Sequence, residues 1–195
     1  IGESFGRRPA NLRNESRLRF PGNEPQQLVR SRRGFQTHCI IGNHAFGYAD
    51  DRRIALSLIT NLLGGPAMNS RLNMVLRERH GLSYNIESVY TPYTETGSFM
   101  IYLGTDNGSL DKALTLVRAE LDKLMQKPLG RIQLNTAKQQ FIGQIAIALE
   151  SNLSDALSMA KSVLVYDRVD THEEMVAKIN AITAEQVMDV AQTVF

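Results

Sequence analysis

The sequence has a single cysteine and no long apolar run. Cys39 is the only cysteine among 195 residues, which excludes an intramolecular disulfide framework and any zinc site built on paired cysteines. No segment reaches the roughly 18 consecutive apolar residues of a transmembrane helix, and the first ten residues lack the apolar core of a signal peptide. We therefore expect neither a membrane span nor an export signal, and we expect a reducing, cytoplasmic compartment.

Metal ligands at a usable spacing and activated nucleophiles are also missing. None of the four histidines has a second histidine and a carboxylate at the spacing of a zinc hydrolase. No serine lies in a G-x-S-x-G elbow, and the Gly64-Gly65 pair lacks the Lys-Ser/Thr ending of a phosphate-binding loop. We expect no metal site and no catalytic nucleophile in this chain. The histidines, which we expect to be surface or hydrogen-bonded residues, are His38, His44, His80 and His172.

Positive charge is concentrated at the start of the chain. Residues 1–33 contain eight arginines and three glutamates, although the whole chain has a net charge of only +2. An arginine-rich arm can bind nucleic acid, which would make binding steeply salt-dependent. However, the segment is interrupted by proline and glycine and shows no helical or strand period. We interpret residues 1–33 as a linker, with nucleic-acid contact as the weaker alternative.

From Gly34 onward, the hydrophobic pattern becomes regular. Apolar residues alternate in three segments, which predicts strands over 34–42, 83–91 and 97–104, the last two forming an antiparallel hairpin. Helical periodicity predicts a helix from Asp50 or Asp51 to Gly64-Gly65, a shorter one from Asn69 or Ser70 closed by Gly81, and one from Asn107 to Pro128. Further helices are predicted at 131–149, 152–166, 172–180 and 184–194, the last two starting at the capping boxes Thr171-x-x-Glu174 and Thr183-x-x-Gln186.

This order of elements predicts an α+β fold. A mostly antiparallel sheet would have its helices packed on one face, because strands come first and helices follow. The core residues expected from the two periods are Leu58, Leu62, Phe99, Ile101, Val117 and Leu121.

One segment, residues 63–106, carries the candidate chemistry. Arg77 lies near the end of the predicted helix, Gly81 ends that helix, and Tyr84 opens the next strand. A cation and a phenol on either side of a sharp corner can point into one space. The structural alternative is that Arg77 pairs with Glu78 on a solvated surface while Tyr84 covers the sheet.

The same segment carries a family resemblance. The run GG-x-x-M-x-S-R-L over 64–72, the run L-R-E-R-x-G-L-x-Y over 76–84 and the tyrosine-rich hairpin ending in G-T-D at 104–106 resemble the C-terminal half of the pitrilysin/insulinase-type (M16) zinc metallopeptidases. Relatives of that family include the mitochondrial processing peptidase subunits. The resemblance extends more weakly from Gln36 to the last helix, and it implies the α+β fold of a metallopeptidase half-domain.

The resemblance implies a division of labour between two halves. In the family, the zinc-binding H-x-x-E-H motif belongs to the N-terminal half, and this sequence has no such motif. The implied organisation is residues 1–33 as linker and end of a preceding half, and residues 34–195 as the C-terminal domain. Zinc would then be a cofactor of the N-terminal half only. A start without Met, and an end at Phe195 where the family adds a strand, suggest a fragment.

The resemblance also implies roles and partners. The implied function is that of the non-metal-binding C-terminal half of a zinc-dependent endopeptidase, which closes the chamber, binds the substrate backbone near the scissile bond and is inactive alone. By motif position, Arg77 and Tyr84 are the substrate-binding residues, with no catalytic residue and no metal ligand in this chain. The implied partners are a peptide or protein substrate and an N-terminal catalytic half or homologous subunit; a homo-oligomer stays open. The alternative function is that of an inactive partner or scaffold subunit in a two-subunit, peptidase-like complex.

Overall fold

A three-stranded antiparallel sheet forms the base of the fold. The computed structural model describes residues 21–22 and 24–195, so the predictions for residues 1–20 and 23, including most of the arginine-rich linker, lie outside the described residues. The strands are β1 (Gln36–Ala45), β2 (Ser83–Pro92) and β3 (Gly97–Asp106), in the spatial order β1-β3-β2. The helices are α2 (Arg53–Gly64), η1 (Asn73–Arg79), α3 (Leu110–Gln126), α4 (Arg131–Leu149), α5 (Asn152–Tyr166), α6 (His172–Ala181) and α7 (Ala184–Val194).

Alternation along the central strand gives the sheet a buried face. Phe99, Ile101 and Leu103 of β3 are almost fully buried, and the residues between them are less so. The register places Ile41 of β1 opposite Ile101 and Ile86 of β2 opposite Leu103. Side chains from all three strands thus meet on one face, as the period of two requires.

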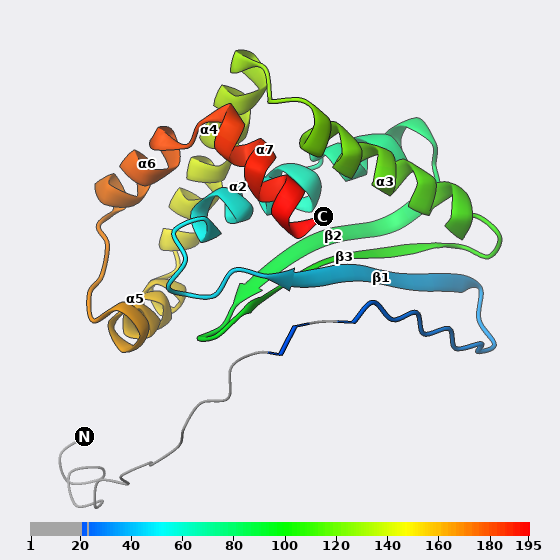
Figure 1. Cartoon of the computed structure of the whole chain (residues 1–195), viewed down its shortest axis with the longest axis horizontal. Coiled ribbons are helices and arrows are strands. Elements are labelled where there is room, and N and C mark those ends of the chain that lie inside the picture. Colours follow the sequence, from blue (N-terminus) through cyan, green and yellow to red (C-terminus); the bar gives the residue numbers. More distant parts are fainter. Residues whose placement is uncertain (1–20, 23) are drawn as a thin grey trace, which may run out of the picture.

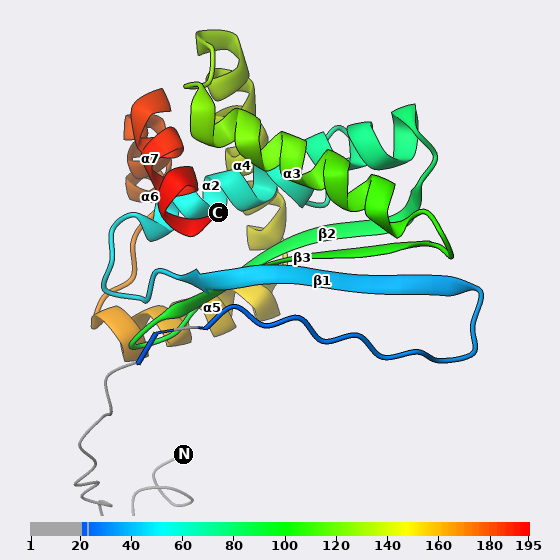
Figure 2. The ribbon, with the colours of Figure 1, turned by 45° about the vertical axis from the view of Figure 1, so that its right-hand side comes forward.

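Helices cover that face. Figures 1 and 2 show α2, α3, α4, α6 and α7 on the same side of the sheet, whereas α5 lies near the β2–β3 turn at the level of the opposite side. The α+β class with an antiparallel sheet and helices on one face is therefore confirmed, with α5 as the helix that departs from it. Of the expected core residues, Leu58, Phe99, Ile101 and Val117 are buried, while Leu62 and Leu121 are partly buried and pack against the core.

Several boundaries differ from those expected. The first strand runs from Gln36 to Ala45 instead of 34–42, because β1 pairs along the whole length of β3. Asp50 does not cap α2; its carboxylate accepts a hydrogen bond from the Arg52 backbone N–H at 2.9 Å and pairs with the Arg52 guanidinium, which lowers the pKa of Asp50. The two capping boxes that open α6 and α7 are confirmed. The described residues 24–33 form no helix or strand.

A half-buried tyrosine gives the fold a titratable marker. The Tyr90 hydroxyl donates a hydrogen bond to the Phe46 carbonyl at 2.7 Å, and burial raises the pKa of Tyr90 to about 12. Because the folded-state pKa lies above the usual value near 10, the stability contributed by the neutral phenol is complete below pH 10 and is lost as the pH rises through 12.

We expect Tyr90→Phe to remove one alkaline titration step. Of the six tyrosines, one should ionise near pH 12 in an ultraviolet titration of the wild-type chain, and that step should be absent in the variant. The lost hydrogen bond should reduce the free energy of unfolding by about 1 kcal/mol at pH 7. A titration that is identical in both proteins would show that Tyr90 is not the tyrosine with the raised pKa.

Candidate functional site: a hollow between a π-helix and the second strand

A sharp corner joins η1 to β2. Gly81 has φ +58°, a left-handed conformation that favours glycine by about 1 kcal/mol over other residues. The Leu82 N–H reaches back to the Leu76 carbonyl at 2.7 Å. On the strand side, the Ser83 hydroxyl donates to the Gly104 carbonyl at 2.6 Å, and the Thr105 hydroxyl donates to the Leu82 carbonyl. The corner is therefore fixed to the central strand by two side-chain hydrogen bonds.

Tyr84 occupies a β-bulge. Ser83 pairs with Thr105 and Asn85 pairs with Gly104, so Tyr84 is the extra residue between them. A bulge turns a side chain out of the regular alternation, and Tyr84 is 64% exposed although Ser83 is buried. Its hydroxyl donates a long hydrogen bond of 3.4 Å to a carboxylate oxygen of Asp106. The phenol is thus available to a ligand at the cost of only a weak, exposed contact.

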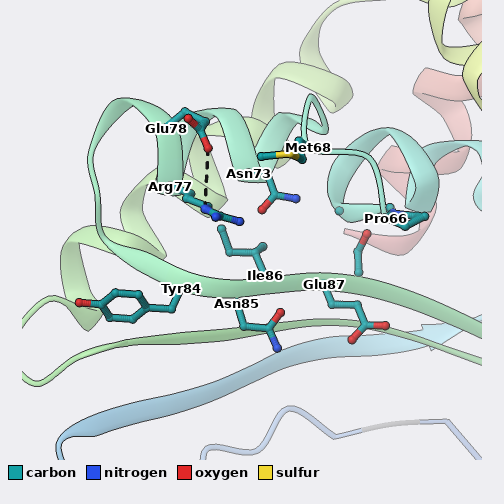
Figure 3. A pocket seen from close by; sticks show the side chains of 12 residues that line it. Pro66, Met68, Asn73, Arg77, Glu78, Tyr84, Asn85, Ile86 and Glu87 are labelled. Carbon is teal, nitrogen blue, oxygen red and sulfur yellow. Dashed lines mark ion pairs between the residues drawn. The ribbon is translucent and has the colours of Figure 1, made fainter.

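Arg77 projects from η1 on the other side of the corner. Its side chain is 51% exposed, and its Nε lies 3.7 Å from a carboxylate oxygen of Glu78. An exposed pair of this kind contributes under about 1 kcal/mol, so a ligand can displace it. Figure 3 shows the guanidinium pointing from η1 toward β2, close to Asn73 and Ile86.

A hollow of about 510 Å³ separates η1 from β2. Its far end is closed by α2, since Gly64 lies so close to β2 that a Cβ there would come 2.7 Å from the Ser88 nitrogen. The glycine pair therefore allows close helix-to-strand packing as well as a chain turn. The lining residues are Gly64, Gly65, Pro66, Met68, Asn73, Arg77, Glu78, Tyr84, Asn85, Ile86, Glu87 and Ser88.

Both expected site residues line this hollow, but their polar ends do not meet. In Figure 3 the Arg77 guanidinium faces inward, while the Tyr84 ring points away from it toward the outer end of the strand. The contact between Arg77 and Glu78 named by the structural alternative is also present. The corner thus places the two residues on one surface and leaves their side chains apart.

Sequence reasoning missed Asn73 as a lining residue. Asn73 lies four residues before Arg77 on the same helix and points into the hollow (Figure 3). A spacing of four puts two side chains on one helical face, so the motif could have indicated it. Asn85 and Glu87 turn to the other side of β2 in the same view.

The arrangement offers hydrogen-bond donors and no reactive group. A guanidinium, a phenol and an amide can each donate to a carbonyl oxygen or to an anion. Among the described residues, no group of three or more His, Cys, Asp or Glu side chains is placed to hold a metal ion. The residues that the structure describes therefore do not fit a zinc ion.

None of the helices in the described part of the chain is long and apolar enough to cross a membrane.

These features define an α+β domain with a hollow lined by hydrogen-bond donors. The described residues of the domain include no cluster of metal ligands. The family model described as "Peptidase M16 inactive domain" matches residues 1–141. The chain belongs to this family and is a C-terminal half-domain of the M16 type.

Curated relatives of the chain are called zinc proteases. The chain is 28% identical over 178 residues to the uncharacterized zinc protease YmxG of Bacillus subtilis, covering 91% of this chain and 43% of that protein. It is 30% identical over 159 residues to the uncharacterized zinc protease SCO5738 of Streptomyces coelicolor, covering 82% and 34%. The chain thus spans less than half the length of these relatives.

Solved structures show the same fold. The peptidase M16 inactive domain from Pseudomonas fluorescens matches with a TM-score of 0.71 at 24% identity, covering 83% of this chain and 39% of that one. A chain of Complex III2 from Candida albicans matches with a TM-score of 0.71 at 16% identity, covering 82% and 40%. At these identities, the likeness concerns the fold alone.

Proposed function

We propose that this chain is the non-metal-binding C-terminal half of a zinc-dependent endopeptidase and that Arg77 and Tyr84 bind the substrate backbone near the scissile bond. The observation that carries the proposal is their placement: two exposed donors flank one rigid corner and line one hollow. The family and the zinc protease relatives supply the chemical context. The other half of the protein would hold the zinc ion, which activates water and polarises the peptide carbonyl.

The role of this chain is to hold the substrate and to stabilise charge. Arg77 can donate from a planar fork to one or two carbonyl oxygens, which fixes the register of an extended peptide. Tyr84 can donate one hydrogen bond to an oxygen on which negative charge develops. Its partner Asp106 is exposed and 3.4 Å away, so rotating the ring toward a substrate breaks little. Because both residues stand on a fixed corner, the remaining motion is limited to side-chain rotation.

The second candidate function is a scaffold. The fold match to a chain of Complex III2 favours it, because that chain is part of an assembly that is not named as a protease. A scaffold domain needs neither donor, so Arg77 and Tyr84 could then be replaced without functional loss. Substitutions at these two positions therefore distinguish the candidates.

We expect this chain alone to bind no catalytic zinc and to cleave no peptide. A lone histidine holds zinc weakly, so metal analysis after exhaustive dialysis should find well under about 0.1 zinc per chain. With its catalytic half present, the protein should carry about one zinc per pair of halves and should hydrolyse an internally quenched peptide. Stoichiometric zinc in this chain, with ligands mapped to its own residues, would contradict the proposal.

A further inference from the structure

Helix α5 presents its apolar side to solvent. An amphipathic helix of a globular protein normally turns its apolar stripe toward the core. In α5, no residue is buried, and Leu153, Leu157 and Leu164 are 72%, 63% and 86% exposed. Their spacing of four and seven residues places them on one line along the helix. The orientation is the reverse of the normal one.

The opposite side of α5 faces the protein and is more polar. The half-buried residues of the helix are Asp155, Ser162, Val165 and Tyr166, three of which carry a polar group. The Tyr166 ring packs edge-on against Tyr48 with centroids 6.1 Å apart, and the Arg53 guanidinium lies 4.7 Å from the Tyr166 ring centre. These contacts fix the rotation of the helix about its own axis. The outward direction of the leucines is therefore held by specific packing.

The outward side is wide and carries no charge. At about 100° per residue, six exposed residues fill an arc of roughly 120°. The only charged residues of α5 are Asp155, on the other side, and Lys161, at the border. The exposed Ile147 at the end of α4 adds to the apolar surface near this helix. We call these six residues the apolar face of α5: Leu153, Ala156, Leu157, Ala160, Val163 and Leu164.

We propose that the apolar face of α5 is the surface on which the other half of the peptidase docks. This inference rests on the proposed function, in which two halves act together. The relatives are more than twice as long as this chain, so a further body of at least its size accompanies the domain in them. An exposed apolar surface without charge is suited to such a permanent contact.

Other occupants fit less well. A helix that lies on a membrane surface carries several lysines or arginines along its polar side, whereas α5 has a single lysine, Lys161, and carries Asp155 on its polar side. A second copy of the chain would need roughly 20–30 residues on each side for a stable interface, far more than this helix offers. A half linked in the same chain needs less area, because its effective concentration is high.

The docking surface is separate from the hollow. Tyr84 stands at the beginning of β2, whereas α5 contacts Tyr48, whose N–H binds the Tyr93 carbonyl just beyond the end of β2. The ten residues of β2 separate the two places. Substitutions in α5 can therefore disturb assembly without touching the substrate-binding residues.

Thiol labelling tests the proposal. In a Cys39→Ala background, Leu164→Cys should react rapidly with a maleimide in the 195-residue chain and at least tenfold more slowly in the two-half protein. Adding Leu157→Glu should restore the fast rate in the two-half protein, because a carboxylate cannot be buried in an apolar contact. Lys112→Cys on α3 serves as the control for reagent access, and its rate should be alike in both proteins.

Three results would overturn the docking proposal. They are an unchanged rate for Leu164→Cys in the two-half protein, protection that rises with concentration in this chain alone, and protection only with vesicles of anionic phospholipid. Protection that rises with concentration would indicate that a second copy of the chain covers α5. Protection only with vesicles would indicate that a membrane covers it. The proposed function is tested by separate measurements of zinc content and peptide cleavage. A two-half protein in which α5 is protected but which has no zinc or no cleavage would contradict the function and leave the docking proposal standing.

Discussion

In the proposed two-half peptidase, Tyr84→Phe is expected to lower kcat/KM by about ten- to a thousand-fold. The change removes one donor to a substrate carbonyl or oxyanion, a loss of about 1.4–4 kcal/mol in transition-state stabilisation. Stability should stay within about 0.5 kcal/mol of wild type, because the hydroxyl is exposed and its only described hydrogen bond is 3.4 Å long. Steady-state hydrolysis and thermal melts of the same preparations measure both quantities.

Two further variants sharpen that result. Tyr93→Phe is the matched control, since Tyr93 is also exposed but lies beyond the opposite end of β2; its kcat/KM should equal that of wild type. Arg77→Lys should keep the charge and still fail to restore full activity, because an ammonium does not reproduce the planar fork. Full activity in Tyr84→Phe would make the tyrosine structural and favour the scaffold function.

Leu76→Ala is expected to destabilise the domain by about 2–5 kcal/mol. Leu76 is fully buried on η1 directly before Arg77 and belongs to the main core. Truncating it removes apolar contacts and leaves a cavity. For a chain of this size, the melting temperature should fall by on the order of 10 °C, which thermal unfolding followed by circular dichroism measures.

The neighbouring residue provides the contrast. Arg77→Ala should change the free energy of unfolding by less than about 0.5 kcal/mol, because its side chain is exposed and its one ion pair is weak. Equal destabilisation by the two substitutions would mean that Arg77 holds the fold together. In that case, the exposure and weak pairing of Arg77 would no longer support its assignment to substrate binding.

The strands and long helices could be predicted because each buries one regular stripe. Phe99 and Ile101 alternate with less buried residues on β3, and a period of two reveals this directly. The capping boxes at Thr171 and Thr183 fix helix starts through local hydrogen bonds alone. Pattern could not reveal that η1 is a π-helix, because a segment of seven residues does not distinguish its wider turn from an α-helical one.

The sequence indicated two residues that line the hollow, but it did not indicate how their side chains lie. The motif placed Arg77 and Tyr84 on either side of Gly81, and both line the hollow. The bulge at Tyr84 depends on how β2 pairs with β3, a contact across about twenty residues that no local period contains. The outward direction of the α5 leucines could not be predicted for a similar reason. Helical spacing shows that an apolar stripe exists, but only the packing of Tyr166 shows which way the stripe faces.

A crystal structure of the two-half protein with a phosphinic peptide would test the central claim most directly. The tetrahedral phosphinate mimics the charged oxygen formed during peptide hydrolysis, so it reports where that charge is stabilised. We predict that the peptide lies along the hollow between η1 and β2, with the Tyr84 hydroxyl or the Arg77 guanidinium within about 3 Å of a peptide carbonyl or phosphinate oxygen. A peptide bound elsewhere, with both side chains left in solvent, would contradict the assignment of this domain to substrate binding.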